Sequence, residues 1–233
     1  MNKRFLWLLP VRSVIFILVF IIGSFVLGKT VSDISNWWSI VAVAVNFLMI
    51  LMLLLTVKKC GIKFAELIDH EKRKTKVRQV VVMILVTLTV GMSGMYLAGF
   101  LCYGVIPYMA PMMVEPVPKT LAIINVLLLP VTTALAEDSL YLGIGVNNIE
   151  NKWLSVIAPA FFFALQHCFI PTLFDVRFII YRFLSFLPLT LIYSLYYRKH
   201  RNLLPIMIGH ATIDLLTAVT ILAASMMPGL FTY

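Results

Sequence analysis

Long apolar stretches alternate with short polar segments along the chain. Each stretch holds about 20 mainly apolar residues, which is the length that an α-helix needs to cross the hydrocarbon core of a bilayer. The pattern therefore predicts an all-α, polytopic membrane helix bundle with about seven transmembrane helices. The predicted spans cover residues 5–27, 38–57, 80–106, 120–142, 153–174, 178–197 and 203–227.

The segments between these spans are short and rich in turn residues. None is long enough to separate two folded units, and the sequence has no internal repeat, so we expect a single membrane domain. Residues 1–119 would supply three N-terminal helices and a basic loop at 58–79. Residues 120–227 would supply the remaining helices and, as argued below, the functional core.

Composition agrees with a membrane protein and excludes several soluble classes. Hydrophobic residues make up 61% of the chain and charged residues only 12%, with a mean hydropathy of +0.99. A soluble globule has about 25% charged residues, so a soluble enzyme, a disordered chain and a nucleic-acid binder are not expected. The three cysteines, Cys60, Cys102 and Cys168, are too scattered for a disulfide framework or a CxxC metal site.

The distribution of Lys and Arg predicts the orientation of the bundle. If the N-terminus is cytoplasmic, 15 of the 19 Lys and Arg residues fall on the inner side and four on the other side or within a span. Membrane proteins keep an excess of these residues in the cytoplasm, so we expect a cytoplasmic N-terminus, in a bacterial cell membrane. The basic loop at 58–79 either lies on anionic lipid or is a solvated loop that only sets topology.

Five Asp, Glu or His side chains lie within the predicted spans. Each costs roughly 2.5–3.5 kcal/mol near the middle of a helix, so together they must pair with one another or line a cavity. By residue counting, Glu137 and His210 lie within about 10 Å of the inner end of their spans, and we expect a site that opens toward that face. The five candidates are Glu137, Asp138, His167, His210 and Asp214.

These residue types suit hydrolysis by an activated water. A carboxylate and an imidazole can take a proton from water, and a second imidazole can donate a hydrogen bond to a developing oxyanion. His210 and Asp214 are four residues apart and so share a helix face. No cofactor is expected. If a metal ion is used, Glu137, His167 and His210 are its candidate ligands, although the HExxH signature of zinc proteases is absent.

Three short motifs in this region resemble those of the CAAX protease and bacteriocin-processing family, also called Abi or CPBP, of intramembrane proteases. The family carries EExxxR, FxxxH and HxxxN or HxxxD on three helices. Here the corresponding segments are Glu137-Asp138-Ser139-Leu140-Tyr141-Leu142, Phe163-Ala164-Leu165-Gln166-His167 and His210-Ala211-Thr212-Ile213-Asp214, in the same order.

The resemblance implies a role for each of these residues. Glu137 and His167 would activate water, His210 and Asp214 would form the oxyanion site, and Asp138 would be the supporting acidic residue. The resemblance also marks three departures: Leu142 in place of Arg, Asp138 in place of Glu and Asp214 in place of the commoner Asn. Arg182, on a later span, is a candidate for the missing cation.

The sequence leaves three functions open. The first is an intramembrane endopeptidase that cleaves a small peptide or a membrane protein. The second is a catalytically weak or inactive relative that acts as a bacteriocin immunity protein or as a membrane scaffold for a partner enzyme. The third is a small transporter, although the paired broken helices typical of transporters are absent.

Overall fold

The computed structural model describes residues 5–68 and 74–227. In this part of the chain the long elements are all helical, and Phe169 and Thr172 form an isolated β-bridge. The elements are α1 (Leu8–Leu27), α2 (Val31–Ser35), α3 (Trp38–Lys59), α4 (Phe64–Ile68), α5 (Val77–Tyr103), η2 (Pro111–Val114), α6 (Lys119–Thr133), η3 (Ala134–Val146), α7 (Leu154–His167), α8 (Val176–His200) and α9 (Leu204–Met226).

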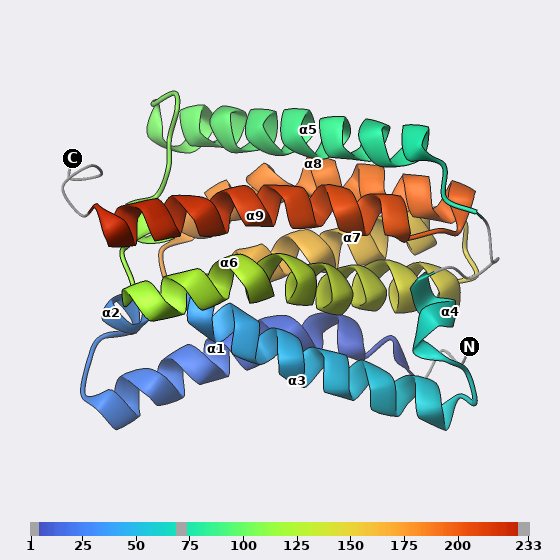
Figure 1. Cartoon of the computed structure of the whole chain (residues 1–233), viewed down its shortest axis with the longest axis horizontal. Coiled ribbons are helices and arrows are strands. Elements are labelled where there is room, and N and C mark those ends of the chain that lie inside the picture. Colours follow the sequence, from blue (N-terminus) through green and yellow to red (C-terminus); the bar gives the residue numbers. More distant parts are fainter. Residues whose placement is uncertain (1–4, 69–73, 228–233) are drawn as a thin grey trace.

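The long helices lie side by side along one axis and form the predicted bundle (Figure 1). Within the described ranges, six helices are long and apolar enough to cross a membrane when α6 and η3 are taken as one. The remaining predicted span contains α7, which is shorter at 14 residues and ends at His167, before the predicted end at residue 174. The all-α bundle with about seven transmembrane helices is therefore confirmed.

The unusual element is η3, which continues α6 without a break. Its 13 residues form a π-helix, a geometry that is rare and is frequently found at functional sites. Pro130 lies one turn before it, inside α6, and has no backbone N–H to donate to the preceding turn. Nearly every residue of η3 is buried, so this segment runs through the centre of the bundle.

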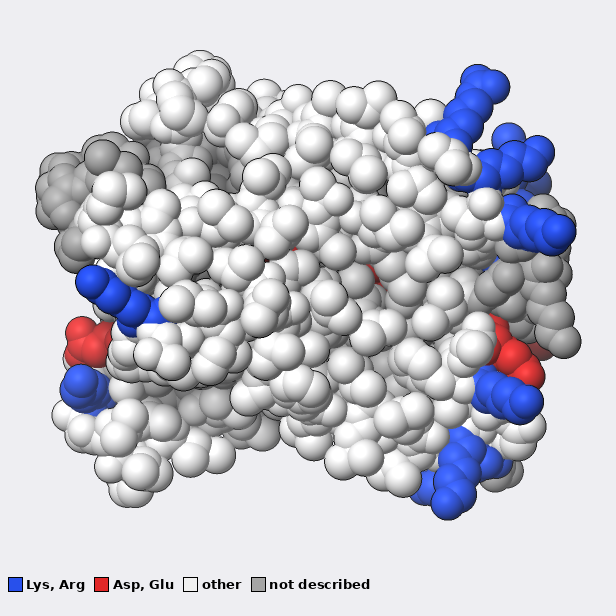
Figure 2. All heavy atoms as spheres, viewed as in Figure 1, with Lys and Arg blue, Asp and Glu red and all other residues white. Residues whose placement is uncertain are grey.

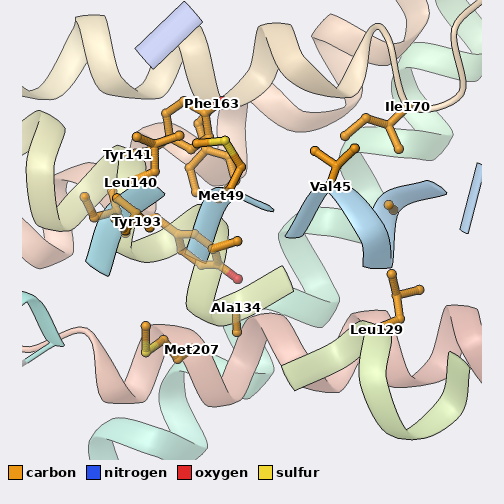
Figure 3. Close-up of a cluster of buried hydrophobic side chains, with 14 of the residues drawn as sticks. Val45, Met49, Leu129, Ala134, Leu140, Tyr141, Phe163, Ile170, Tyr193 and Met207 are labelled. Atoms are coloured by element: carbon orange, nitrogen blue, oxygen red, sulfur yellow. The ribbon is translucent and has the colours of Figure 1, made fainter. Parts of the chain in front are cut away.

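Aromatic and aliphatic side chains fill the space around η3. Tyr141 of η3 stacks on Phe163 of α7 with ring centroids 4.7 Å apart, and Leu140 and Tyr193 lie beside them (Figure 3). The outer surface is apolar as well, with large side chains such as Phe25 and Leu127 exposed. A bundle that is apolar outside and holds its polar groups inside is typical of an integral membrane protein.

The charged side chains gather at the two ends of the bundle. Figure 2 shows Lys and Arg mostly at the end where α3 finishes and α5 begins, while the middle of this face is almost free of charge. We call this the basic end. Among the described residues, its cations are Lys58, Lys59, Lys63, Lys74, Lys76, Arg78, Lys152, Arg198, Lys199 and Arg201, whereas the opposite end has Lys29, Lys119 and Arg177.

Candidate active site

The structure brings the five sequence candidates together in the middle of the bundle. Glu137 and Asp138 come from η3, His167 is the last residue of α7, and His210 and Asp214 lie one turn apart on α9. Four of them are buried, and the Asp214 side chain keeps 22% of its surface exposed.

Glu137 is at the centre of this cluster. Its Oε2 atom lies 3.9 Å from Nε2 of His167 and also 3.9 Å from Nε2 of His210. These distances exceed a direct hydrogen bond, so both imidazoles face the same carboxylate oxygen without contacting it. Two imidazoles and one carboxylate thus converge on a common point.

The charge of Glu137 is balanced by a residue that the motif analysis missed. Nη2 of Arg12, on α1, donates to Oε1 of Glu137 at 2.7 Å, and both side chains are buried. The same Nη2 atom donates to Oδ1 of Asn46 on α3. The Asn46 amide in turn donates to the hydroxyls of Thr132 and Thr133, just before η3. Arg12 therefore connects α1, α3 and η3.

Arg182 does not replace the Arg that the family motif has at position 142. Its Nε and Nη2 atoms donate to the backbone carbonyls of His167 and Ile170, at 3.0 and 2.8 Å. It forms no ion pair with any described carboxylate. The compensating cation is Arg12, while Leu142 is fully buried among apolar residues. Arg12 was visible in the sequence only as an isolated charge within the first span.

A second donor fixes the other oxygen of Glu137. Gln166, the residue before His167, donates from Nε2 to Oε2 of Glu137 at 2.6 Å. The hydroxyl of Tyr141 donates to Oε1 of Gln166 at 3.2 Å and holds the amide in this orientation. The carboxylate is therefore clamped between Arg12 and Gln166, with Oε2 turned toward the two imidazoles.

The backbone sets the tautomer of His167. Its Nδ1 lies 2.9 Å from the carbonyl oxygen of Phe163, one turn earlier in α7. A carbonyl only accepts, so Nδ1 must carry the proton, and Nε2 of the neutral ring offers its lone pair toward Glu137. The ring of Phe186 packs on the other side, with centroids 3.7 Å apart. The His167 ring is thus held in one orientation, with Nε2 facing the cluster.

His210 lies between carboxylates on both sides of its ring. Nδ1 donates to Oδ1 of Asp138 at 3.1 Å, and Nε2 lies 3.7 Å from Oδ2 of Asp214. A carboxylate on Nδ1 orients an imidazole and stabilises its protonated form. Nε2 of His210 can therefore present an N–H to the same point that Glu137 and His167 face.

A cavity of about 110 Å³ adjoins the cluster, and it is lined by Glu137, His167 and His210 as well as by apolar side chains. Its more distant lining residues include Trp38 at the start of α3, Met113 in η2 and Ile170 after α7. These positions lie on the side away from the basic end (Figure 1).

The cavity extends away from the basic end, which is the end that the sequence predicts to be cytoplasmic. On the basic side, η3 is covered instead: a Cβ atom on Gly143 would lie 3.3 Å from Leu67 of α4 and 3.7 Å from Leu203. Counting residues along a helix gives the depth of a side chain, but it does not show which neighbouring elements close one side.

The side chains do not form a ready metal site. Within the described ranges, no three or more His, Cys, Asp or Glu side chains are grouped so that they could hold a metal ion. Glu137, His167 and His210 are the candidates named above, but both oxygens of Glu137 already accept hydrogen bonds from Arg12 and Gln166. A guanidinium 2.7 Å from the carboxylate also disfavours a second cation there.

Comparison with known proteins supports the same region. The family model described as Type II CAAX prenyl endopeptidase Rce1-like matches residues 119–216. The match begins at the first residue of α6 and includes all five candidate residues, whereas Arg12 lies outside it. No curated protein and no solved structure matches the chain. The resemblance to the CAAX protease family is thus confirmed for this part of the chain.

Proposed function

We propose that the chain is an intramembrane endopeptidase of the CAAX protease type, which hydrolyses a peptide bond in a small peptide or a membrane protein. One observation carries this proposal: Nε2 of His167 and Nε2 of His210 lie at the same distance, 3.9 Å, from one oxygen of the buried Glu137. The proposal rests on the match to residues 119–216 as well.

In the proposed reaction, a water molecule gives a proton to the Glu137 and His167 pair while its oxygen attacks the scissile carbonyl carbon. The carbonyl oxygen becomes an oxyanion and accepts a hydrogen bond from Nε2–H of His210. The C–N bond then breaks, and the proton taken from water passes to the leaving amine. The products are one carboxylic acid and one amine, so no nucleophilic Ser or Cys is needed.

The structure favours an active enzyme over the inactive alternative, because two of the three departures from the family motif have counterparts here. Arg12 supplies the cation that Leu142 cannot. Asp138, although shorter than Glu, still reaches Nδ1 of His210 at 3.1 Å.

We further propose that the basic end is cytoplasmic and that the protein resides in a bacterial cell membrane. The ten cations at this end, against three at the other, support this orientation under the positive-inside rule. The cavity would then extend from the cluster toward the outer half of the bilayer, and its apolar lining suits an apolar segment of a peptide. The partners are thus the lipid bilayer and the peptide substrate.

The test is cleavage of a peptide library by the purified protein in detergent, followed by mass spectrometry. We expect the wild type to cleave a subset of apolar peptides and Glu137→Gln to cleave none, because Gln cannot accept a proton. Glu115→Gln, a carboxylate change in the loop after η2, is the matched control and should retain activity. If Glu137→Gln cleaves as fast as the wild type, the proposed function is wrong.

A further inference from the structure

Arg182 is a buried cation whose role the proposed reaction does not explain. It lies on α8 with 3% of its surface exposed, yet no described carboxylate forms an ion pair with it. A charged side chain in the interior of a membrane bundle is costly and usually marks a binding or transport site. Arg182 also lines the cavity that contains the candidate active site.

The hydrogen bonds of Arg182 leave one edge of its guanidinium free. Of its five N–H donors, one on Nε reaches the His167 carbonyl and one on Nη2 reaches the Ile170 carbonyl. Nη1 makes no hydrogen bond to the described residues, and it is not among the polar atoms sealed from solvent. The donors that remain, on Nη1 and Nη2, form the edge that binds a carboxylate in a bidentate manner.

Arg182 is held close to the reacting groups. Its guanidinium carbon lies 4.8 Å from the centroid of the Phe186 ring, and Phe186 in turn stacks on His167. With two carbonyls and one ring fixing its position, little conformational freedom remains to be lost when an anion binds. An anionic group at Arg182 would therefore lie beside His167.

We propose that Arg182 forms a carboxylate-binding subsite for the peptide substrate. This inference rests on the proposed function, since it assumes that a peptide enters the cavity. Arg182 and the candidate catalytic residues Glu137 and His167 line the same cavity, and Arg182 donates to the His167 carbonyl. The bound carboxylate therefore belongs to a residue near the scissile bond.

Two sources of this carboxylate share the same chemistry: the C-terminus of the substrate and an Asp or Glu side chain. A matched set of apolar hexapeptides with a fluorescent N-terminal label distinguishes them. One version has a free C-terminal acid, a second has a C-terminal amide, and a third has the amide together with one Glu near the C-terminus. Binding is measured to the full chain carrying Glu137→Gln, so that no peptide is consumed.

We expect at least one carboxylate version to bind about 10- to 100-fold more tightly than the uncharged amide, the range for hydrogen bonds to charged groups. Preference for the free acid identifies the C-terminus as the source, and preference for the Glu peptide identifies the side chain. In Arg182→Gln the preference should fall below about threefold. Arg177→Gln, an exposed Arg on the same helix, should leave it unchanged.

Equal affinity for all three peptides overturns the subsite, and so does a preference that persists in Arg182→Gln or a failure to bind any of them. If Arg182→Gln does not fold, Arg182→Lys is used instead. This variant keeps the charge, and the affinities of the three peptides still show whether a carboxylate is preferred. A failure of the subsite can be distinguished from a failure of the proposed function. Cleavage without a carboxylate preference contradicts only the subsite, whereas carboxylate-dependent binding without cleavage by the wild type contradicts only the catalysis.

Discussion

Replacing Arg12 by Leu should destabilise the bundle strongly, because it leaves the Glu137 carboxylate buried without its cation. Both side chains are almost fully buried, and their atoms are 2.7 Å apart. Removing one partner of such a pair costs about 3–5 kcal/mol. For a chain of this size, 1 kcal/mol shifts the unfolding temperature by about 2–4 °C, so Arg12→Leu should lower it by roughly 6–20 °C.

A double-mutant cycle separates this ion pair from simple loss of packing. In a Glu137→Gln background the carboxylate is neutral, so Arg12→Leu should cost much less than in the wild type. Arg78→Leu, at an exposed position of α5, is the matched control and should change stability by less than about 0.5 kcal/mol. Thermal unfolding in detergent measures all four variants. Equal destabilisation by Arg12→Leu in both backgrounds would show that the ion pair with Glu137 does not stabilise the bundle.

Three further predictions concern the cluster and the topology. Asp214→Asn should retain most of the cleavage rate while Asp214→Ala loses about 10²–10³-fold, because an amide can donate to the oxyanion beside His210. The cleavage rates of both variants across pH test this. A rate for Asp214→Asn as low as that for Asp214→Ala would reject it. Gln166→Met should lower kcat/KM by about 10-fold or more, since the 2.6 Å donor to Glu137 is lost; an unchanged kcat/KM in the folded variant would contradict it. In a background without native cysteines, Lys29→Cys and Lys152→Cys should react with an impermeant thiol reagent from opposite sides, and labelling from one side would disprove the orientation.

The spans and the candidate residues were predictable from the sequence for physical reasons. A bilayer requires about 20 apolar residues per helix, so the long apolar stretches predicted the bundle directly. Ionisable groups are so costly within a membrane that the positions of Glu137, His167 and His210 stood out without any structure. Their convergence was then required, because only mutual proximity or a cavity can lower that cost.

The supporting contacts were not predictable, because they depend on tertiary packing. Arg12 is separated from Glu137 by 125 positions, and nothing in the sequence of α1 indicates its partner. Arg182 was the nearer candidate for the missing cation, but it binds carbonyls instead. The π-helix of η3 also has no clear sequence signal, since Pro130 marks an irregularity without specifying its geometry.

The catalytic roles of Glu137 and His167 can be tested most directly by the cleavage rates of three variants. We expect Glu137→Gln and His167→Ala each to reduce cleavage to the background rate. The double variant should be no slower than either single one, because residues that act on the same water are not additive. Cleavage at the wild-type rate by the double variant, with the protein folded, would exclude these catalytic roles and favour a scaffold or immunity protein.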